Sequence, residues 1–155
     1  MNAGDPRRRA WLCGAVAWAL AGPALSIDNP DAPDWTAAFQ ARAQPLEEQV
    51  SVTAGGPGQA AAGATYARFL DGELNQAYQA LLKQLEGEAR RALVQSQRQW
   101  LAFRDSEGRF IARNWTLQNF GSSSALSRAD YQASLVKQRV LTLLAYLQNY
   151  PPSRH

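Results

Sequence analysis

Acidic side chains are the groups in this chain whose chemistry is most readily catalytic. The candidates are Asp71, Glu73, Asp105, Glu107 and Asp130. A glycosidase needs two such carboxyl groups that converge on one bond in environments that push their pKa values apart. Asp71 and Glu73 are two positions apart and would not face each other on a helix. The spacing of the other acidic residues does not require any two of their carboxyl groups to converge. The carboxylates therefore do not define a hydrolytic site.

Other candidate catalytic groups lack the partners that their chemistry needs. His155 is the only histidine and follows a double proline, and the only cysteine, Cys13, lies in a segment that we expect to be removed. Ser122 to Ser124 have no histidine to activate them. No cluster has metal-ligand spacing, and the glycine-rich segment 55–58 lacks the lysine and strand of a phosphate loop. We predict a protein that is not an enzyme, with no catalytic residue, cofactor or metal.

A polar stripe runs through the segment LVQSQRQWLAFRD, residues 93–105. Leu93, Gln97, Trp100 and Arg104 recur at spacings of four, three and four, so that on a helix they occupy one face. A purely apolar core face would not include an amide and a guanidinium. The stripe therefore predicts a packed face that also carries a polar network, although a ligand-facing role for Trp100 or Arg104 is the alternative.

The partner of Arg104 is expected on another helix. Adjacent residues on a helix point about 100° apart, so Arg104 and Asp105 are not expected to pair with each other. Asp71, Asn75, Gln97 or a main-chain carbonyl would then receive the guanidinium. A buried guanidinium needs such a partner because an uncompensated charge is costly.

Four motifs in order carry a family resemblance. They are LDGELN from residue 70, the 93–105 segment with its Q..W..FRD pattern, the Gly-Ser turn 121–123, and LVKQRVLTLL from residue 135. Together these motifs, over about residues 66–147, resemble the lysozyme-inhibitor LprI-type family of small bacterial envelope proteins. Arg139 falls at the family's late arginine position, and we add it to the expected network.

The resemblance also implies a structural substitution. Family members usually carry one cysteine just after the W..FRD segment and another eight residues before the late arginine, where this chain has Gly108 and Tyr131. If those cysteines bridge two helices, the two positions should face each other at disulfide range. We predict that the Tyr131 ring packs over Gly108 in place of the disulfide. The alternative is that Gly108 is simply a tolerated helix glycine.

The apolar spacing from residue 64 onward is helical. It predicts helices over about 65–85 and 89–115, separated near Gly87, and a third helix capped by Ser127 and Asp130 that stops before Pro151. No segment alternates like a strand. The predicted fold is all-α, an antiparallel bundle of three main helices with a short additional N-terminal helix.

The region before residue 64 carries less information. Asp34 can cap a short helix that starts at Trp35, and Pro45 would interrupt that helix or start another. The Gly/Ala-rich segment 51–63 reads as a mobile linker. We therefore assign residues 27–63 to a flexible leader, a short helix and a linker, and residues 64–150 to the helical domain.

Residues 1–26 read as a secretory signal peptide. Three arginines precede an apolar run over residues 10–25, and Ala24 and Ser26 are suitably small for cleavage after Ser26. A lipid anchor at Cys13 is disfavoured by the bulky Leu12 before it. The expected location is periplasmic or secreted, without stable membrane insertion after cleavage. The mature chain would carry 13 basic and 12 acidic side chains, a net charge of +1, which gives no strong attraction to nucleic acid.

The segment 114–125, NWTLQNFGSSSA, is the expected recognition loop. It combines aromatic residues with adaptable polar groups, as protein-binding surfaces do. The candidate partner-binding residues are Trp115, Asn119, Phe120, Ser122, Ser123 and Ser124. The alternative is that the aromatic side chains tuck under the end of the bundle.

Two functions follow from these observations. The resemblance implies an exported inhibitor that blocks a lysozyme or another cell-wall hydrolase. The second is a periplasmic adaptor that binds a different envelope protein. A strongly acidic patch near the loop would favour inhibition, and an exposed apolar stripe would favour the adaptor.

Overall fold

The computed structural model describes residues 33–53 and 55–149. The expected signal peptide, most of the leader and His155 lie outside these residues. The described chain forms, in order, α1 (Trp35–Val52), α2 (Gly56–Gln84), α3 (Gly87–Asn114), α4 (Leu117–Phe120), a 3-10 turn η1 (Gly121–Ser123) and α5 (Ser124–Gln148). These residues include no strand, and the all-α prediction is confirmed.

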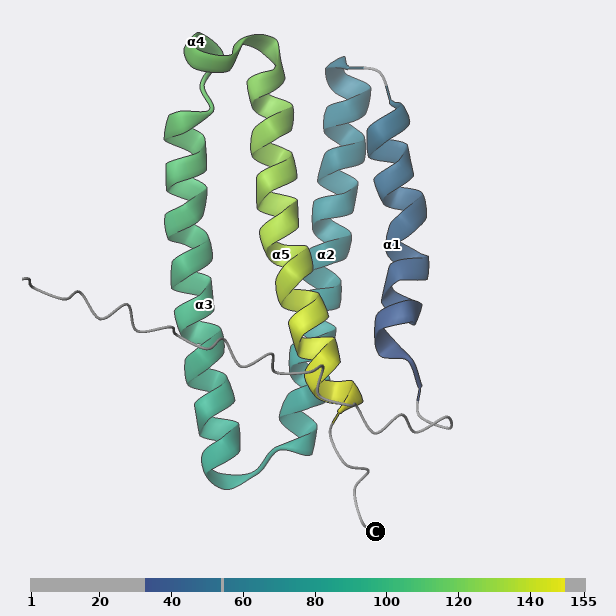
Figure 1. Cartoon of the computed structure of the whole chain (residues 1–155), viewed down its shortest axis with the longest axis vertical. Coiled ribbons are helices and arrows are strands. Elements are labelled where there is room, and N and C mark those ends of the chain that lie inside the picture. The colour runs from purple at the N-terminus through teal and green to yellow at the C-terminus, as the bar shows by residue number, and fades with distance from the viewer. Residues whose placement is uncertain (1–32, 54, 150–155) are drawn as a thin grey trace, which may run out of the picture.

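The four long helices alternate in direction along the chain (Figure 1). α2 and α5 run in the same direction and form the closest helix pair, with α1 beside them on one flank and α3 on the other (Figure 1). α4 and η1 connect α3 to α5 at one end of the bundle, and the turn between α2 and α3 lies at the opposite end. This arrangement places the expected recognition loop at an end of the bundle.

α1 is longer than the sequence indicated. Its 18 residues run without interruption through Pro45, although proline removes one helical hydrogen bond. The fully buried Phe39 and the nearly buried Ala43 anchor this helix to the core, which offsets that loss. The prediction that Pro45 breaks the helix is therefore wrong.

The expected linker over residues 51–63 is instead a short turn between two helices. α1 continues to Val52 and α2 begins at Gly56. Gly55 and Gly56 have φ values of 50° and 64°, a region that glycine adopts without steric cost. The proposed domain boundary at residue 64 consequently falls inside α2.

α3 agrees with its predicted range within two residues at each end, whereas α5 starts earlier than predicted. Ser123 precedes α5 and makes no side-chain cap bond, and Ser127 lies inside the helix. The capping role predicted for Ser127 and Asp130 is therefore wrong. The reason is that η1 leads directly into α5, so that no free helix end exists at Ser127.

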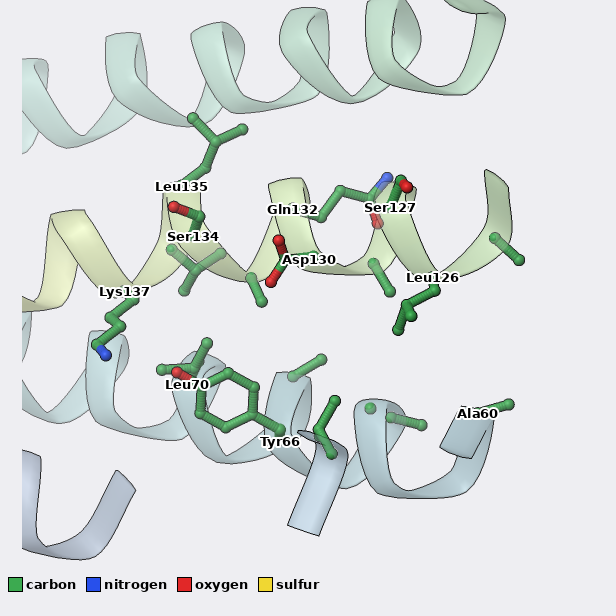
Figure 2. A pocket seen from close by; sticks show the side chains of 18 of the residues that line it. Ala60, Tyr66, Leu70, Leu126, Ser127, Asp130, Gln132, Ser134, Leu135 and Lys137 are labelled. Atoms are coloured by element: carbon green, nitrogen blue, oxygen red, sulfur yellow. The ribbon is translucent and has the colours of Figure 1, made fainter. Parts of the chain in front are cut away.

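An open hollow lies between the first half of α2, the second half of α3 and the first half of α5 (Figure 2). Its volume of about 1710 Å³ exceeds the roughly 300–1,000 Å³ of small-molecule pockets. Asp130 on α5 and Tyr66 on α2 lie on facing sides of it (Figure 2). Its walls carry both acidic and basic side chains, including Asp71, Arg109 and Asp130, so it is not the strongly acidic patch that would favour inhibition.

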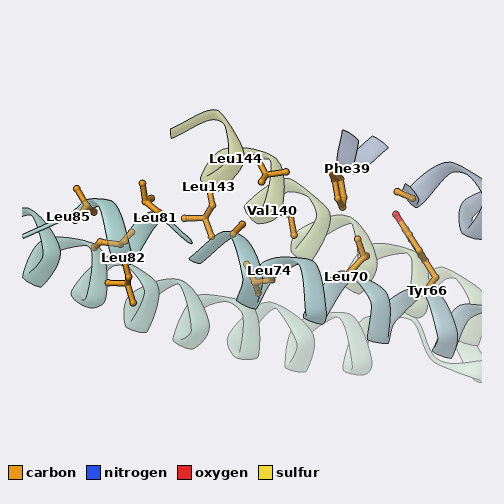
Figure 3. Close-up of a cluster of buried hydrophobic side chains, with 13 residues drawn as sticks. Phe39, Tyr66, Leu70, Leu74, Leu81, Leu82, Leu85, Val140, Leu143 and Leu144 are labelled. Atoms are coloured by element: carbon orange, nitrogen blue, oxygen red, sulfur yellow. The ribbon is translucent and has the colours of Figure 1, made fainter. Parts of the chain in front are cut away.

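The hydrophobic core lies mainly between α2 and α5 (Figure 3). Leu70 of α2, Val140 and Leu143 of α5 and Phe39 of α1 are fully buried. Phe39 also stacks on Phe69, with ring centroids 6.1 Å apart. α1 is therefore part of the core.

Two polar clusters also attach α1 to the central helices. Arg42 donates from Nε and Nη2 to the two carboxylate oxygens of the buried Glu73, at 3.0 and 2.7 Å. Lys137 Nζ lies 2.6 Å from Glu47 Oε1, which also accepts the hydroxyl of Tyr66. Burial works to raise the pKa of Glu47, but the bonds from Lys137 and Tyr66 outweigh it and leave that pKa lowered.

Candidate functional site

The connection from α3 to α5 is held in a defined conformation. The N–H of Trp115 donates to the Ile111 carbonyl at 3.0 Å and ends α3. The Thr116 side chain then caps α4 by accepting the N–H of Asn119 at 3.2 Å. Gly121 follows with a φ of 63°, which allows the chain to turn into η1. Residues 114–127 contain no charged side chain.

Trp115 is the centre of an aromatic cluster at this end of the bundle. Its ring lies 4.6 Å from Tyr131, 5.8 Å from Phe120 and 5.8 Å from Phe110, measured between ring centroids. The Phe110 contact is edge-on and the Phe120 contact is stacked, geometries that aromatic rings favour. α3, α4 and α5 each contribute one ring besides Trp115, so the cluster joins three elements.

Much of this cluster is open to solvent. Phe110 is 55% exposed, Phe120 46% and Tyr131 44%, and Leu117 of α4, two residues after Trp115, is 72% exposed. We call these four residues together with Trp115 the aromatic tip. Exposed apolar groups gathered at one place mark interaction surfaces more often than scattered ones do. The exposure of Phe120 favours recognition over the alternative that it tucks under the bundle.

Arg128 fixes the position of Trp115 from α5. Its Nη1 donates a hydrogen bond to the Trp115 carbonyl, which lies at the carboxyl end of α3. A cation there is favoured by the helix dipole. The tip is therefore preorganised by a charge-assisted bond between α5 and the end of α3.

The polar residues expected in the recognition loop divide into two groups. Asn119, Ser122 and Ser123 are exposed, with Asn119 Nδ2 donating to the Asn114 carbonyl at 3.2 Å and Ser123 Oγ to the Phe120 carbonyl at 2.9 Å. Ser124 is only 3% exposed. Its assignment as a partner-binding residue is wrong, because a buried side chain does not present its hydroxyl to a partner.

Phe110, Leu117 and Tyr131 were not recognised as part of this surface. Phe110 follows Phe103 by seven residues, two helical turns, on the same side of α3, and both are exposed. This pair of apolar residues, on a face of the helix other than the packed stripe, is the sequence pattern that indicates an exposed apolar surface. Leu117 had no such periodic signal, because it lies in the four-residue α4.

Four of the six residues expected to form the polar network contact one another. Arg139 Nε donates to Gln97 Oε1 at 3.0 Å. The guanidinium carbons of Arg104 and Arg139 lie 5.7 and 5.8 Å from the centre of the Trp100 ring, within cation–π range. Gln97 is buried and Trp100 is partly buried. These contacts join the middle of α3 to α5.

The expectation for the partner of Arg104 was wrong. Its Nε and Nη2 both donate to Asp105 Oδ1, at 3.2 and 3.0 Å, although the two residues are adjacent. The arginine side chain is long enough for its guanidinium to reach the neighbouring carboxylate, so the divergence of adjacent Cα–Cβ bonds does not prevent contact. Asp71 and Asn75 are exposed on α2, and within residues 33–53 and 55–149 neither forms a bond with Arg104 or Gln97.

The carboxylates do not gather into one site. Glu73 pairs with Arg42, and Asp105 pairs with Arg104. Asp71 and Asp130 lie on different helices that border the hollow. Within the described residues, no group of three or more His, Cys, Asp or Glu side chains is placed to hold a metal ion.

The model of the family named Lysozyme inhibitor LprI matches residues 47–143, well over half of the 155 residues. The chain belongs to this family. The comparisons with curated proteins and with solved structures each returned no match. The matched range begins inside α1 and ends inside α5, so it includes Trp115, Phe120 and Arg139.

The two positions where LprI-type proteins usually have cysteines are not in direct contact here. A Cβ added to Gly108 would lie 4.0 Å from Gln132 Nε2, with no Tyr131 atom within that distance. The Tyr131 ring contacts Trp115 instead. The prediction that Tyr131 packs over Gly108 is therefore wrong. A neighbouring indole offers the phenol ring a larger apolar surface than a glycine does.

Proposed function

We propose that this member of the LprI family binds a lysozyme or a related peptidoglycan-cleaving enzyme and inhibits it through the aromatic tip. The observation that carries the proposal is the group of exposed apolar side chains around Trp115. The family description, lysozyme inhibitor, supplies the class of target. Large, rigid aromatic side chains near the centre of an interface contribute much of its binding free energy.

The tip has a composition suited to a cleft that contains carboxylates. Leu117 and Phe120 project from a loop without charged side chains, so they can enter a cleft without burying a charge. Asn119 and Ser122 add an exposed amide and an exposed hydroxyl donor, whereas the Ser123 hydroxyl already donates to the Phe120 carbonyl. Such donors would bond to the acidic groups of a glycoside hydrolase. Inhibition would then follow from occupation of the cleft.

Inhibition assays with matched variants test this proposal. The purified protein is titrated into several lysozymes, including a bacterial one, together with the double variant Leu117→Ala, Phe120→Ala. The control is Trp35→Ala, because Trp35 is 47% exposed and is the first residue of α1, the helix on the opposite flank of the bundle from α3 (Figure 1). We expect the double variant to weaken inhibition by about thirtyfold or more, about 2 kcal/mol, and the control to leave it unchanged.

Inhibition that survives the double variant would retain the function and reject the tip as its site. No inhibition of any lysozyme by micromolar protein would reject the inhibitor proposal. The adaptor is then the alternative, and Phe103 and Phe110 are the observation that favours it, because both are exposed on the same side of α3. A protein that docks along α3 would protect Phe103 as well as the tip.

We also propose that residues 1–26 direct export and are removed, so that the protein acts in the periplasm or outside the cell. The arginines and apolar run of that segment support this. Among the described helices, none has the length and apolar character needed to cross a membrane. Mass spectrometry of the protein recovered from its native host should show a mature N-terminus at Ile27, and an intact Met1 would contradict the cleavage.

A further inference from the structure

Two cations that bond between elements of this bundle meet an acidic partner. Arg42 of α1 bonds to Glu73 of α2, and Lys137 of α5 bonds to Glu47 of α1. Each of these cations pairs with a carboxylate while its own side chain stays partly exposed. Charge-assisted bonds of this kind are stronger than bonds to neutral acceptors.

Two other arginines meet the carboxyl ends of helices. Arg90 donates to the Leu82 carbonyl in the last turn of α2, and Arg128 donates to the Trp115 carbonyl at the end of α3. The carbonyl groups there lack helical partners and carry the negative end of the helix dipole. These cations are therefore also compensated electrostatically.

Arg139 differs from all four. Its acceptors are two neutral side chains in the middle of α3, Gln97 Oε1 at 3.0 Å and Ser96 Oγ at 3.3 Å. No carboxylate of the described residues pairs with it. Burial lowers its pKa, and a smaller opposing effect comes from Tyr146. The guanidinium is thus partly desolvated without a negative partner, an arrangement that costs free energy.

The neighbouring Arg104 provides an internal comparison. Both guanidinium groups lie against the Trp100 ring at nearly equal distances. Arg104 already has the Asp105 carboxylate, 3.0 Å from its Nη2. Among residues 33–53 and 55–149, Arg139 donates hydrogen bonds only from Nε and Nη2, so these residues leave its Nη1 available. Its side chain is partly exposed. A second carboxylate could therefore approach Arg139 from solvent.

We propose that Arg139, held by Gln97, Ser96 and Trp100, is a binding site for a carboxylate of the protein partner, an aspartate or glutamate side chain. The site is preorganised. The bonds to Gln97 and Ser96 fix the orientation of the Arg139 guanidinium, and the Trp100 ring lies against one side of it. That the carboxylate belongs to a protein partner rests on the proposed function. The affinity of Arg139 for a carboxylate does not rest on it.

An NMR titration of the intact protein with sodium acetate, replacing chloride at constant ionic strength, tests the site without any lysozyme. The arginine Nε–H resonances of Arg139, Arg104 and the exposed Arg98 are followed together. We expect the Arg139 signal to shift saturably, with a dissociation constant about tenfold or more below that of the other two. An Arg139 signal that responds no more than Arg98 would overturn the proposal and leave Arg139 as a tie between α3 and α5.

The source of the carboxylate is tested with an inhibited lysozyme and the variants Arg139→Gln and Arg139→Lys. We expect acetate to weaken inhibition by the unmodified protein and to have a much smaller effect on Arg139→Gln. Arg139→Lys should recover only part of the affinity, since it keeps the charge but loses the fork. Acetate binding with no effect on inhibition would reject the protein carboxylate as the ligand. If Leu117→Ala, Phe120→Ala abolishes inhibition but Arg139 still binds acetate, the carboxylate site is intact and the loss belongs to the aromatic tip.

Discussion

Arg42 and Glu73 illustrate how much one side-chain pair contributes to the attachment of α1. Glu73 is buried, whereas the Arg42 side chain is half exposed. Arg42→Ala would leave a buried carboxylate without its two donors, and solvent at the open side would reduce the cost. We expect a loss of about 1–2 kcal/mol in the free energy of unfolding, measured with urea.

Arg68→Ala is the control for that measurement. Arg68 is exposed, and among the described residues it bonds only within α2, to the Ala64 carbonyl and Thr65 Oγ1. Its removal should change stability by less than about 0.5 kcal/mol. Equal effects of the two substitutions would show that the ion pair with Glu73 does not hold α1 in place.

Glu47 makes stability depend on pH. Its pKa is lowered in the folded protein, so its contribution is fully present above the unfolded value of about 4.5 and is lost as the pH falls through the lower folded value. Urea unfolding of the unmodified protein and of Glu47→Gln at pH 7 and in steps below pH 4.5 measures this effect. The difference in stability between the two proteins should shrink as the solution becomes more acidic, and a constant difference would contradict the assignment.

Single residues also mark where sequence reasoning reached its limit. The contact between Gln97 and Arg139 followed from helical spacing and the family resemblance. The pairing of Arg104 with Asp105 did not, because helical geometry fixes the direction of Cβ but not the path of a long side chain. The contact predicted between Tyr131 and Gly108 is also not formed, because the Tyr131 ring packs against Trp115. An aromatic ring can pack against any of several nearby apolar surfaces. The tertiary positions of those surfaces decide which one it contacts, and residue spacing does not predict them.

At the scale of elements, the turn from α4 into α5 depends on Gly121. Its φ is 63°, and nothing lies within 4 Å of an added Cβ. Gly121→Ala would therefore act through backbone conformation alone and should destabilise the protein by about 1 kcal/mol. The same substitution should weaken inhibition, because it reorients Phe120.

Gly72 is a matched comparison for Gly121. It lies inside α2, and an added Cβ there also meets nothing within 4 Å. Gly72→Ala should stabilise the protein by up to about 1 kcal/mol because alanine is the better helix former. Thermal unfolding of both variants measures the contrast. A stabilising Gly121→Ala would show that the turn does not require a left-handed residue.

The helices themselves were predictable to different degrees. α2 from residue 65, α3 and most of α5 have a sustained apolar period of 3.6, which local physics converts into a helix. α1 and the start of α2 contain proline, glycine and many alanines, which read as a break and a linker. Packing of Phe39 and Ala43 against the core overrides these local preferences. α5 begins earlier than predicted because η1 leads directly into it.

At the scale of the whole molecule, the helix order determines which surfaces are free. α2 and α5 form the centre, α1 covers one flank, and α3 lies on the other beside the open hollow. The end of α3 then carries the aromatic tip away from the main core. Helix spacing predicted an all-α bundle. The convergence of Phe110, Phe120 and Tyr131 on Trp115 depends on the relative positions of three elements, which helical spacing alone does not predict.

The most direct test of the aromatic tip as the lysozyme-binding surface is hydrogen–deuterium exchange of the protein with and without an inhibited lysozyme. Backbone amides in residues 114–123 should exchange more slowly in the complex, since the partner would cover α4 and η1 and suppress their opening. Amides in residues 35–44 of α1 should be unchanged. Unchanged exchange in 114–123 together with protection of another surface would contradict the account.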